Sequence, residues 1–134
     1  MEEIYQKFAA CDGKHVTIYI PHLNLMYTGF LECVEYDAHE KDDAARIYYH
    51  LSDNEEGVDL DDVTSQTSNH NIRFVIMLDF AYDEICIWYE DWCEYYIDSQ
   101  WCDPCEAIPL TLPGYTDSEL TIAPNQIRIS ELKM

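Results

Sequence analysis

Apolar residues at the start of the chain recur with the spacing of a helix. In residues 2–14, EEIYQKFAACDGK, the apolar positions are Ile4, Phe8 and Cys11. They lie four and three residues apart, which places them on one helical face. Gly13 follows and is a typical C-terminal stop. The pattern predicts a short N-terminal helix that buries one side.

Three β-rich runs follow this helix. They cover residues 15–22, 26–37 and 45–53, are rich in β-branched and aromatic residues, and are separated by polar turns. Alternating apolar and polar positions are clearest in the first run. This arrangement predicts a three-stranded antiparallel meander.

The second half of the chain is less regular. Residues 72–80, IRFVIMLDF, are apolar on both faces, which favours a central strand, and residues 83–90 could return beside them as a hairpin. From Asp83 onward the apolar spacing also fits one face of a helix, so the stretch beyond residue 90 stays open between strand and helix. The polar residues 57–71 predict a long loop or flap.

Three prolines shape the C-terminal part, where Pro109, Pro113 and Pro124 exclude a long helix. Residues 126–132 read as a closing strand. The whole pattern predicts one α+β domain over residues 1–134, built as a mostly antiparallel sheet or a small barrel with a short N-terminal helix. In the order of its elements alone, this arrangement resembles small Sm-like or SH3-like barrels.

The composition supports a folded protein. Hydrophobic residues make up 48% of the 134 residues, with eleven tyrosines and only four glycines, which is enough apolar material to offset chain entropy. No apolar run approaches the roughly 18 residues of a transmembrane helix, and the first residues lack a secretory signal pattern. We therefore expect a cytoplasmic protein whose six cysteines are mostly thiols.

Charge narrows the classes of partner. Twenty-seven acidic residues against seven Lys and Arg give a net charge of −20. Such a charge repels DNA, RNA and anionic membranes and attracts basic surfaces. The sequence therefore predicts no direct nucleic-acid binding, no membrane binding, and a basic protein as partner.

The acidic residues gather in clusters interleaved with Tyr and Trp. Alternate residues on a strand lie about 6.6 Å apart on one side, a separation of the order of neighbouring phosphates. Arginine binds carboxylates and phosphates with the same bidentate geometry, so such rows can imitate nucleic acid. A solvated acidic face with no partner is the simpler alternative. We expect charge reversal in these clusters to remove partner binding and leave the fold largely intact. The candidate partner-binding residues are Glu35, Asp37, Asp53, Glu55, Glu56, Asp59, Asp61, Asp62, Glu90, Asp91, Glu94 and Asp98.

Four cysteines lie within residues 86–105. Three of them, Cys93, Cys102 and Cys105, form a C-x8-C-x2-C set that a fourth ligand such as His70 could complete to a structural zinc site. Ordinary buried thiols are the alternative, and we therefore expect no cofactor unless this zinc site forms.

The remaining cysteines, Cys11, Cys33 and Cys86, lie in apolar patterns that predict packing roles. One further motif includes two cysteines of the zinc set. The stretch WCDPC at 101–105 resembles the WCxPC motif of thioredoxin-like oxidoreductases, but only 29 residues follow it, too few for the rest of that fold.

No catalytic constellation is present in the sequence. The serines lie in no nucleophile-elbow context, no glycine-rich phosphate loop occurs, and the five histidines form no HExxH set. We therefore expect a protein that is not an enzyme.

In composition over the whole chain, the protein resembles the small acidic DNA-mimic anti-restriction and anti-CRISPR proteins of phages and mobile elements. The resemblance implies a non-catalytic inhibitor, acting in the cytoplasm of a host cell, that blocks the nucleic-acid-binding surface of a defence nuclease or CRISPR complex. The alternative is an acidic adaptor or assembly subunit, with or without structural zinc, whose aromatic residues could form a homodimer interface.

Overall fold

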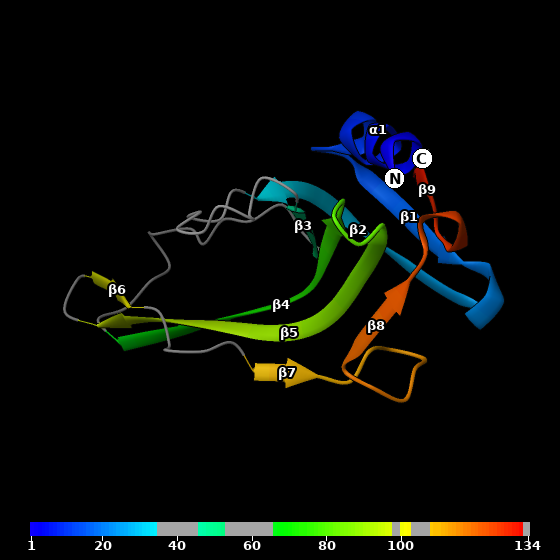
Figure 1. The fold of residues 1–134 in the computed structure, drawn as a ribbon. Helices are drawn as coiled ribbons and strands as arrows, with labels where there is room; N and C mark the ends of the chain where they lie inside the picture. Colours follow the sequence, from blue (N-terminus) through cyan, green and yellow to red (C-terminus); the bar gives the residue numbers. More distant parts are fainter. Residues whose placement is uncertain (35–45, 53–65, 98–99, 103–107, 133–134) are drawn as a thin grey trace.

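The computed structural model describes residues 1–34, 46–52, 66–97, 100–102 and 108–132, with residues 66–71, 92–97 and 100–102 described by their backbone alone. Figure 1 shows the helix α1 beside a curled sheet. In chain order, the described elements are α1 (Glu2–Cys11), β1 (His15–Ile20), the 3-10 turn η1 (Pro21–Leu23), β2 (Leu25–Val34), β3 (Arg46–Ser52), β4 (Gln66–Asp79), β5 (Glu84–Ile97), β6 (Gln100–Cys102), β7 (Ile108–Leu110), β8 (Glu119–Ile122), the 3-10 turn η4 (Pro124–Gln126) and β9 (Arg128–Glu131).

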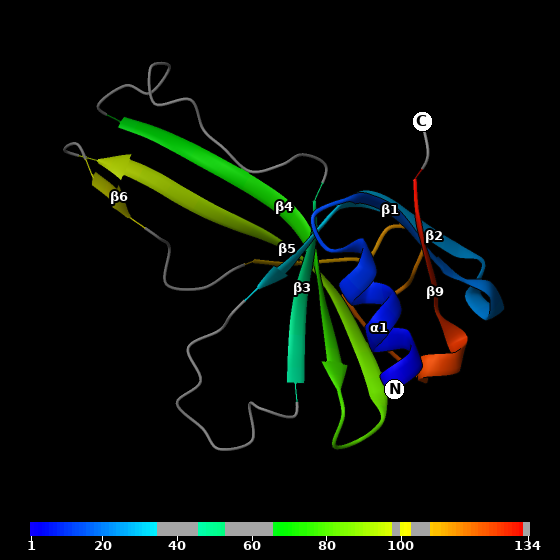
Figure 2. The same ribbon diagram turned by 90° about the horizontal axis from the view of Figure 1, so that it is seen from above.

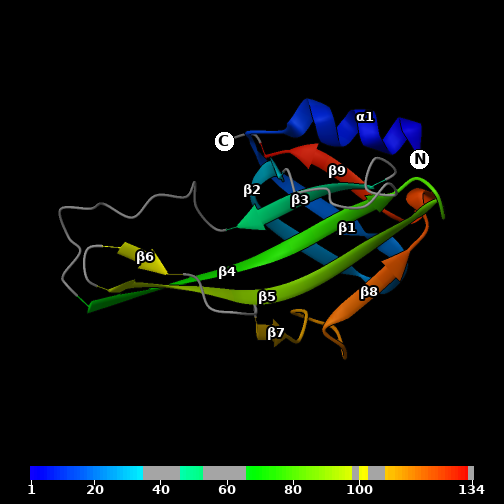
Figure 3. The same cartoon turned by 60° about the vertical axis from the view of Figure 1, so that its left-hand side comes forward.

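The predicted N-terminal helix is confirmed. Its three spaced apolar residues, Ile4, Phe8 and Cys11, are the buried ones. Two acidic residues in its first turn interact favourably with the helix dipole. Gly13, with φ of 79°, takes the left-handed conformation that glycine adopts without strain. The helix lies along β9 at one end of the sheet (Figure 3).

Every strand pairing among the described residues is antiparallel. Nine strands form one sheet with the order β6-β5-β4-β3-β2-β1-β9, and β7 and β8 also pair with β5. The predicted meander is β1, β2 and β3 in adjacent positions. Of the two architectures expected, the sheet is the one found, and it is open. Its path runs from β6 to β9, and no pairing among the described residues joins these two ends.

The centre of the fold is the β4–β5 hairpin. The two strands have fourteen residues each and stay in register from Gln66 opposite Ile97 to Asp79 opposite Glu84. This confirms the predicted central strand and hairpin. The expected loop over residues 57–71 is wrong for its last six residues, which belong to β4. The helical alternative beyond residue 90 is also excluded, since β5 continues as a strand to Ile97.

The C-terminal part contains no long helix within the residues described, as its prolines predict. The closing strand is shorter than expected, because a 3-10 turn occupies residues 124–126 and β9 covers only Arg128–Glu131. The short strands β7 and β8 were not predicted. Together with β6 they cover successive parts of the outer edge of β5.

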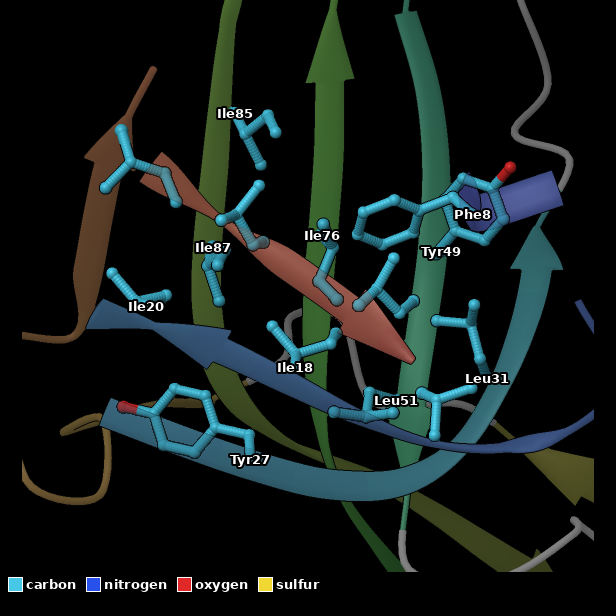
Figure 4. Packing of buried hydrophobic residues seen from close by; sticks show 14 of the residues in the cluster. Phe8, Ile18, Ile20, Tyr27, Leu31, Tyr49, Leu51, Ile76, Ile85 and Ile87 are labelled. Carbon is cyan, nitrogen blue, oxygen red and sulfur yellow. The ribbon is translucent and has the colours of Figure 1, made fainter. Parts of the chain in front are cut away.

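The core lies on the inner face of the curled sheet, closed at one end by α1. Figure 4 shows Phe8 against Tyr49, with ring centroids 5.2 Å apart, and isoleucines and leucines of β1 to β5 around them. At the other end, the rings of Tyr27, Phe74 and Tyr89 stack with centroid separations of 4.4 and 4.5 Å. The Tyr27 hydroxyl donates a hydrogen bond of 2.7 Å to the Pro113 carbonyl.

Beyond this aromatic stack the β4–β5 hairpin continues past the core. Strand β3 ends at Ser52, opposite Arg73, so residues 66–72 of β4 are not paired with it. Residues 66–72 pair with residues 91–97 of β5, and β6 pairs with the end of β5 on the other side. We call residues 66–72, 91–97 and β6 the distal ribbon. Figures 1 and 2 show it extending away from the helix and the core.

Candidate partner-binding surface

The acidic residues are concentrated in the two segments that precede and follow β3. Residues 35–45 and 53–65 together hold eleven of the 27 acidic residues and one lysine, Lys41. The first segment precedes Arg46, where β3 begins, and the second follows Ser52, where it ends. Seven residues of strand span about 20 Å, so the two acidic segments join the sheet at points separated by roughly that distance. Nine predicted partner-binding residues lie outside the described residues: Glu35, Asp37, Asp53, Glu55, Glu56, Asp59, Asp61, Asp62 and Asp98.

Glu90 has a structural contact that the sequence analysis did not anticipate. Its Oε1 lies 3.1 Å from the Nε of Arg73, directly opposite on β4, and the two side chains are only 13% and 9% exposed. A buried carboxylate facing a buried guanidinium is costly to reverse. The expectation that charge reversal here leaves the fold intact is therefore revised, and we leave Glu90 out of the proposed binding surface.

Glu90, Asp91 and Glu94, a cluster of three predicted partner-binding residues, do not all lie on one face of the sheet. Asp91 is the next residue along β5, so the alternation of the strand places it on the opposite face of the sheet, where it is partly buried. Glu94, described by its backbone alone, lies opposite Asn69 and shares the face of Glu90. The cluster is therefore divided between the two faces of the sheet.

Asp79 is a second acid with a structural role. It is only 2% exposed, and its Oδ1 accepts hydrogen bonds from the backbone N–H groups of Ala81 (3.0 Å) and Tyr82 (3.3 Å). Its Oδ2 lies 3.5 Å from the Nε of Arg46. These contacts fix the β4–β5 turn.

Eight acids are exposed among the residues whose side chains are described: Glu2, Glu3, Asp12, Glu32, Asp83, Asp117, Glu119 and Glu131.

Most of the described cationic side chains are engaged within the fold. Lys14 lies 3.5 Å from Glu131, Arg46 pairs with Asp79, and Arg73 pairs with Glu90. Each of these cations neutralises an acid of the sheet.

His50 is a buried titratable group that is influenced by the charge of Arg73. It is 8% exposed on β3, opposite Glu32 of β2 and Val75 of β4. Burial, assisted by the positive charge of Arg73, lowers the pKa of His50 from its ordinary value to about 4. The imidazole is therefore neutral in the folded protein near pH 7.

This pKa predicts an acid-sensitive contribution to stability. An unfolded histidine titrates near pH 6.5, so protonation favours the unfolded state as the pH falls from about 6.5 towards 4. Between pH 7 and pH 4 the wild type should lose on the order of 2–3 kcal/mol more than His50→Gln in its free energy of unfolding. Urea denaturation across this range measures the difference. His22→Gln, at an exposed position, is the control and should follow the wild type; equal pH profiles for His50→Gln and wild type would contradict the prediction.

Of the three cysteines predicted to have packing roles, two are buried and one is exposed. Cys11 and Cys86 are buried, as predicted, and burial raises the pKa of both thiols, which keeps them protonated and unreactive. Cys33 is exposed, contrary to the packing prediction. It lies near the end of β2, beyond Leu31, the last buried position of that strand.

Two of the three predicted metal-binding cysteines lie on the distal ribbon. Cys93 is on β5 opposite His70, Cys102 is on β6 opposite Tyr95, and Cys105 lies outside the described residues. Since Cys102 is part of a strand, the WCDPC stretch departs from the helix start that the thioredoxin-like motif requires. Among the side chains that the structure describes, no group of three His, Cys, Asp or Glu residues is arranged to hold a metal ion.

The described helices include none long and apolar enough to cross a membrane. Comparison of the chain with models of known protein families, with curated proteins and with solved structures finds no match.

Proposed function

We propose that this protein is a non-catalytic acidic inhibitor that mimics nucleic acid and blocks the basic nucleic-acid-binding surface of a host defence nuclease or CRISPR complex. One observation carries the proposal. Eleven acids with a single lysine join the sheet at the two ends of β3, while Lys14, Arg46 and Arg73 pair with other acids of the sheet. The excess of acids over lysine in these two segments is the feature that a basic partner would recognise.

The physical basis is the similarity of carboxylates and phosphates as arginine ligands. A groove that binds phosphates with arginine forks also accepts carboxylates in comparable positions. A net charge of −20 accelerates encounter with such a groove and repels competing polyanions. Binding by occupancy of the groove requires no catalytic group in the inhibitor.

The test compares two variants of equal net charge. In the first, Asp59, Asp61 and Asp62 of the second acidic segment become asparagine. In the second, three exposed acids outside both segments, Glu2, Glu3 and Glu119, become glutamine. The partner is captured at low salt on the immobilised wild-type protein, identified and purified, and its affinity for each variant is then measured.

We expect the first variant to bind the partner about tenfold or more weakly and the second to change affinity by less than about twofold, since only the first removes contacts to the groove. Duplex DNA or RNA should displace the partner, and binding should weaken steeply with salt. The protein alone should not bind DNA or RNA at physiological salt. Displacement by nucleic acid then means that the nucleic acid occupies the partner and does not bind the inhibitor itself.

Two results would decide against mimicry. Equal weakening by the two variants would mean that total charge, and not the acidic segment, attracts the partner. If neither salt nor nucleic acid changes the affinity for the partner, the alternative function is favoured, an assembly subunit that binds through an apolar interface.

A further inference from the structure

A pocket of about 630 Å³ lies between α1, the 3-10 turn η4 and the start of β9, and Asp83 of the β4–β5 turn completes its lining. Figure 2 shows the N-terminal end of α1 beside the β4–β5 turn and the short orange-red turn before β9. The pocket is therefore at the end of the hairpin opposite the distal ribbon. Its volume is in the range of small-molecule sites, roughly 300–1,000 Å³.

The pocket contains two basic side chains without an acidic partner. Among the Lys and Arg residues whose side chains are described, Lys14, Arg46 and Arg73 each pair with an acid. Lys7 and Arg128 form no ion pair or side-chain hydrogen bond with any described residue, and both line the pocket. Acids outnumber Lys and Arg by 27 to 7 in the chain, so acidic partners are plentiful. An anion bound in the pocket would give both cations a counter-charge.

The acids of the pocket leave these two cations available. Asp83 lies 3.3 Å from the amino group of Met1, so its carboxylate already has a counter-charge. Glu3 is the other acid of the lining and precedes Lys7 by one turn of α1, but no ion pair joins the two within the described structure. Glu3 is therefore a competitor of an external anion and not its replacement.

Apolar side chains form much of the remaining lining. Ile4 and Ile127 are 6% and 4% exposed, and Ala123 and Pro124 are half-buried. A ligand with an apolar part gains free energy by covering these groups, whereas a small inorganic anion does not. A ligand with several negative charges would be repelled by the net charge of −20. The lining therefore favours a molecule with one negative charge and an apolar body.

We propose that this pocket binds a small monocarboxylic acid with an apolar body, and that Lys7 and Arg128 bind its carboxylate. Arginine binds a carboxylate through two parallel N–H groups, and lysine adds a point charge. The apolar body would cover Ile4 and Ile127. The pocket lies outside both acidic segments, so the site is independent of the inhibitor function and would remain if that function were disproved.

The test is a titration of the full-length protein with octanoate, followed by the chemical shifts of the backbone amides. We expect about one octanoate per chain and saturable shifts at Ile4, Asn125 and Ile127 of the lining. Octanamide, which has the same apolar chain without the charge, should bind about tenfold more weakly, because it cannot neutralise the two cations.

Two sets of variants separate the pocket from the total charge. Lys7→Gln and Arg128→Gln should each weaken octanoate binding about fivefold or more. Lys14→Gln removes an equal charge outside the pocket and should change the affinity by less than about twofold. Glu3→Gln removes the competing acid and should strengthen binding about threefold, whereas Glu2→Gln, its neighbour outside the lining, should not. All five positions are exposed, so each variant should keep the fold, and its amide spectrum verifies this.

Three results would each overturn the proposal. Octanoate could leave the amides of the lining unshifted, which would mean that the pocket does not bind it. Octanamide could bind as tightly as octanoate, which would leave only an apolar contact. The pocket variants and their controls could change the affinity equally, which would mean that total charge, and not Lys7 and Arg128, determines binding.

Discussion

Glu90→Gln is expected to lower the free energy of unfolding by about 3–5 kcal/mol, because it leaves the buried guanidinium of Arg73 without the carboxylate opposite it. Both side chains are largely buried and lie 3.1 Å apart in the middle of the hairpin on which the sheet is built. Glutamine has the same size as glutamate, so the decrease in the free energy of unfolding measures the contribution of the negative charge. Guanidinium denaturation monitored by tryptophan fluorescence measures it.

Two further variants separate the lost charge from other effects. Glu119→Gln removes an exposed acid from β8, beside β5, and should change stability by less than about 0.5 kcal/mol. The double variant Arg73→Met with Glu90→Leu replaces the pair with apolar groups and should recover most of the loss. If Glu90→Gln costs no more than Glu119→Gln, the pair does not stabilise the hairpin.

Phe8→Ala is expected to cost about 3–5 kcal/mol, the range for removing a fully buried aromatic side chain and leaving a cavity. Phe8 is 0% exposed and packs against Tyr49, and it is the central apolar residue by which α1 contacts the sheet. Thermal and denaturant unfolding measure the loss. Gln6→Ala, at an exposed position of the same helix, should change stability by less than about 0.5 kcal/mol. A similar cost for both substitutions would show that the burial of Phe8 does not determine the effect.

The elements with regular apolar spacing could be predicted from the sequence. Ile4, Phe8 and Cys11 defined one helical face, and alternation defined the first strand of the meander, because each of these two segments buries one side. The extensions of the hairpin could not be predicted. Residues 66–71 are uniformly polar, and their strand conformation depends on pairing with β5. Strands β7 and β8, of three and four residues, are too short to show a period.

The candidate site was predicted less completely. The density of acids indicated a negative surface, but it did not distinguish Glu90, which pairs with Arg73, from exposed acids. The sequence did contain a signal for this ion pair. Arg73 is the only charged residue between Ile72 and Leu78 in an otherwise apolar run, and a buried guanidinium requires a counter-charge. The facing positions of His70 and Cys93 follow from the strand register, which the sequence alone does not provide.

The pairing of β1 with β9 has a consequence for the order of folding during synthesis. Val16 lies opposite Glu131, so strands separated by more than a hundred residues are neighbours in the sheet. A ribosome delivers the chain from its N-terminal end, and β1 has no partner on that side until β9 emerges. Contacts so distant in sequence slow folding. We therefore expect one edge of β1 to stay unpaired, and open to chaperones, until β9 has been synthesised.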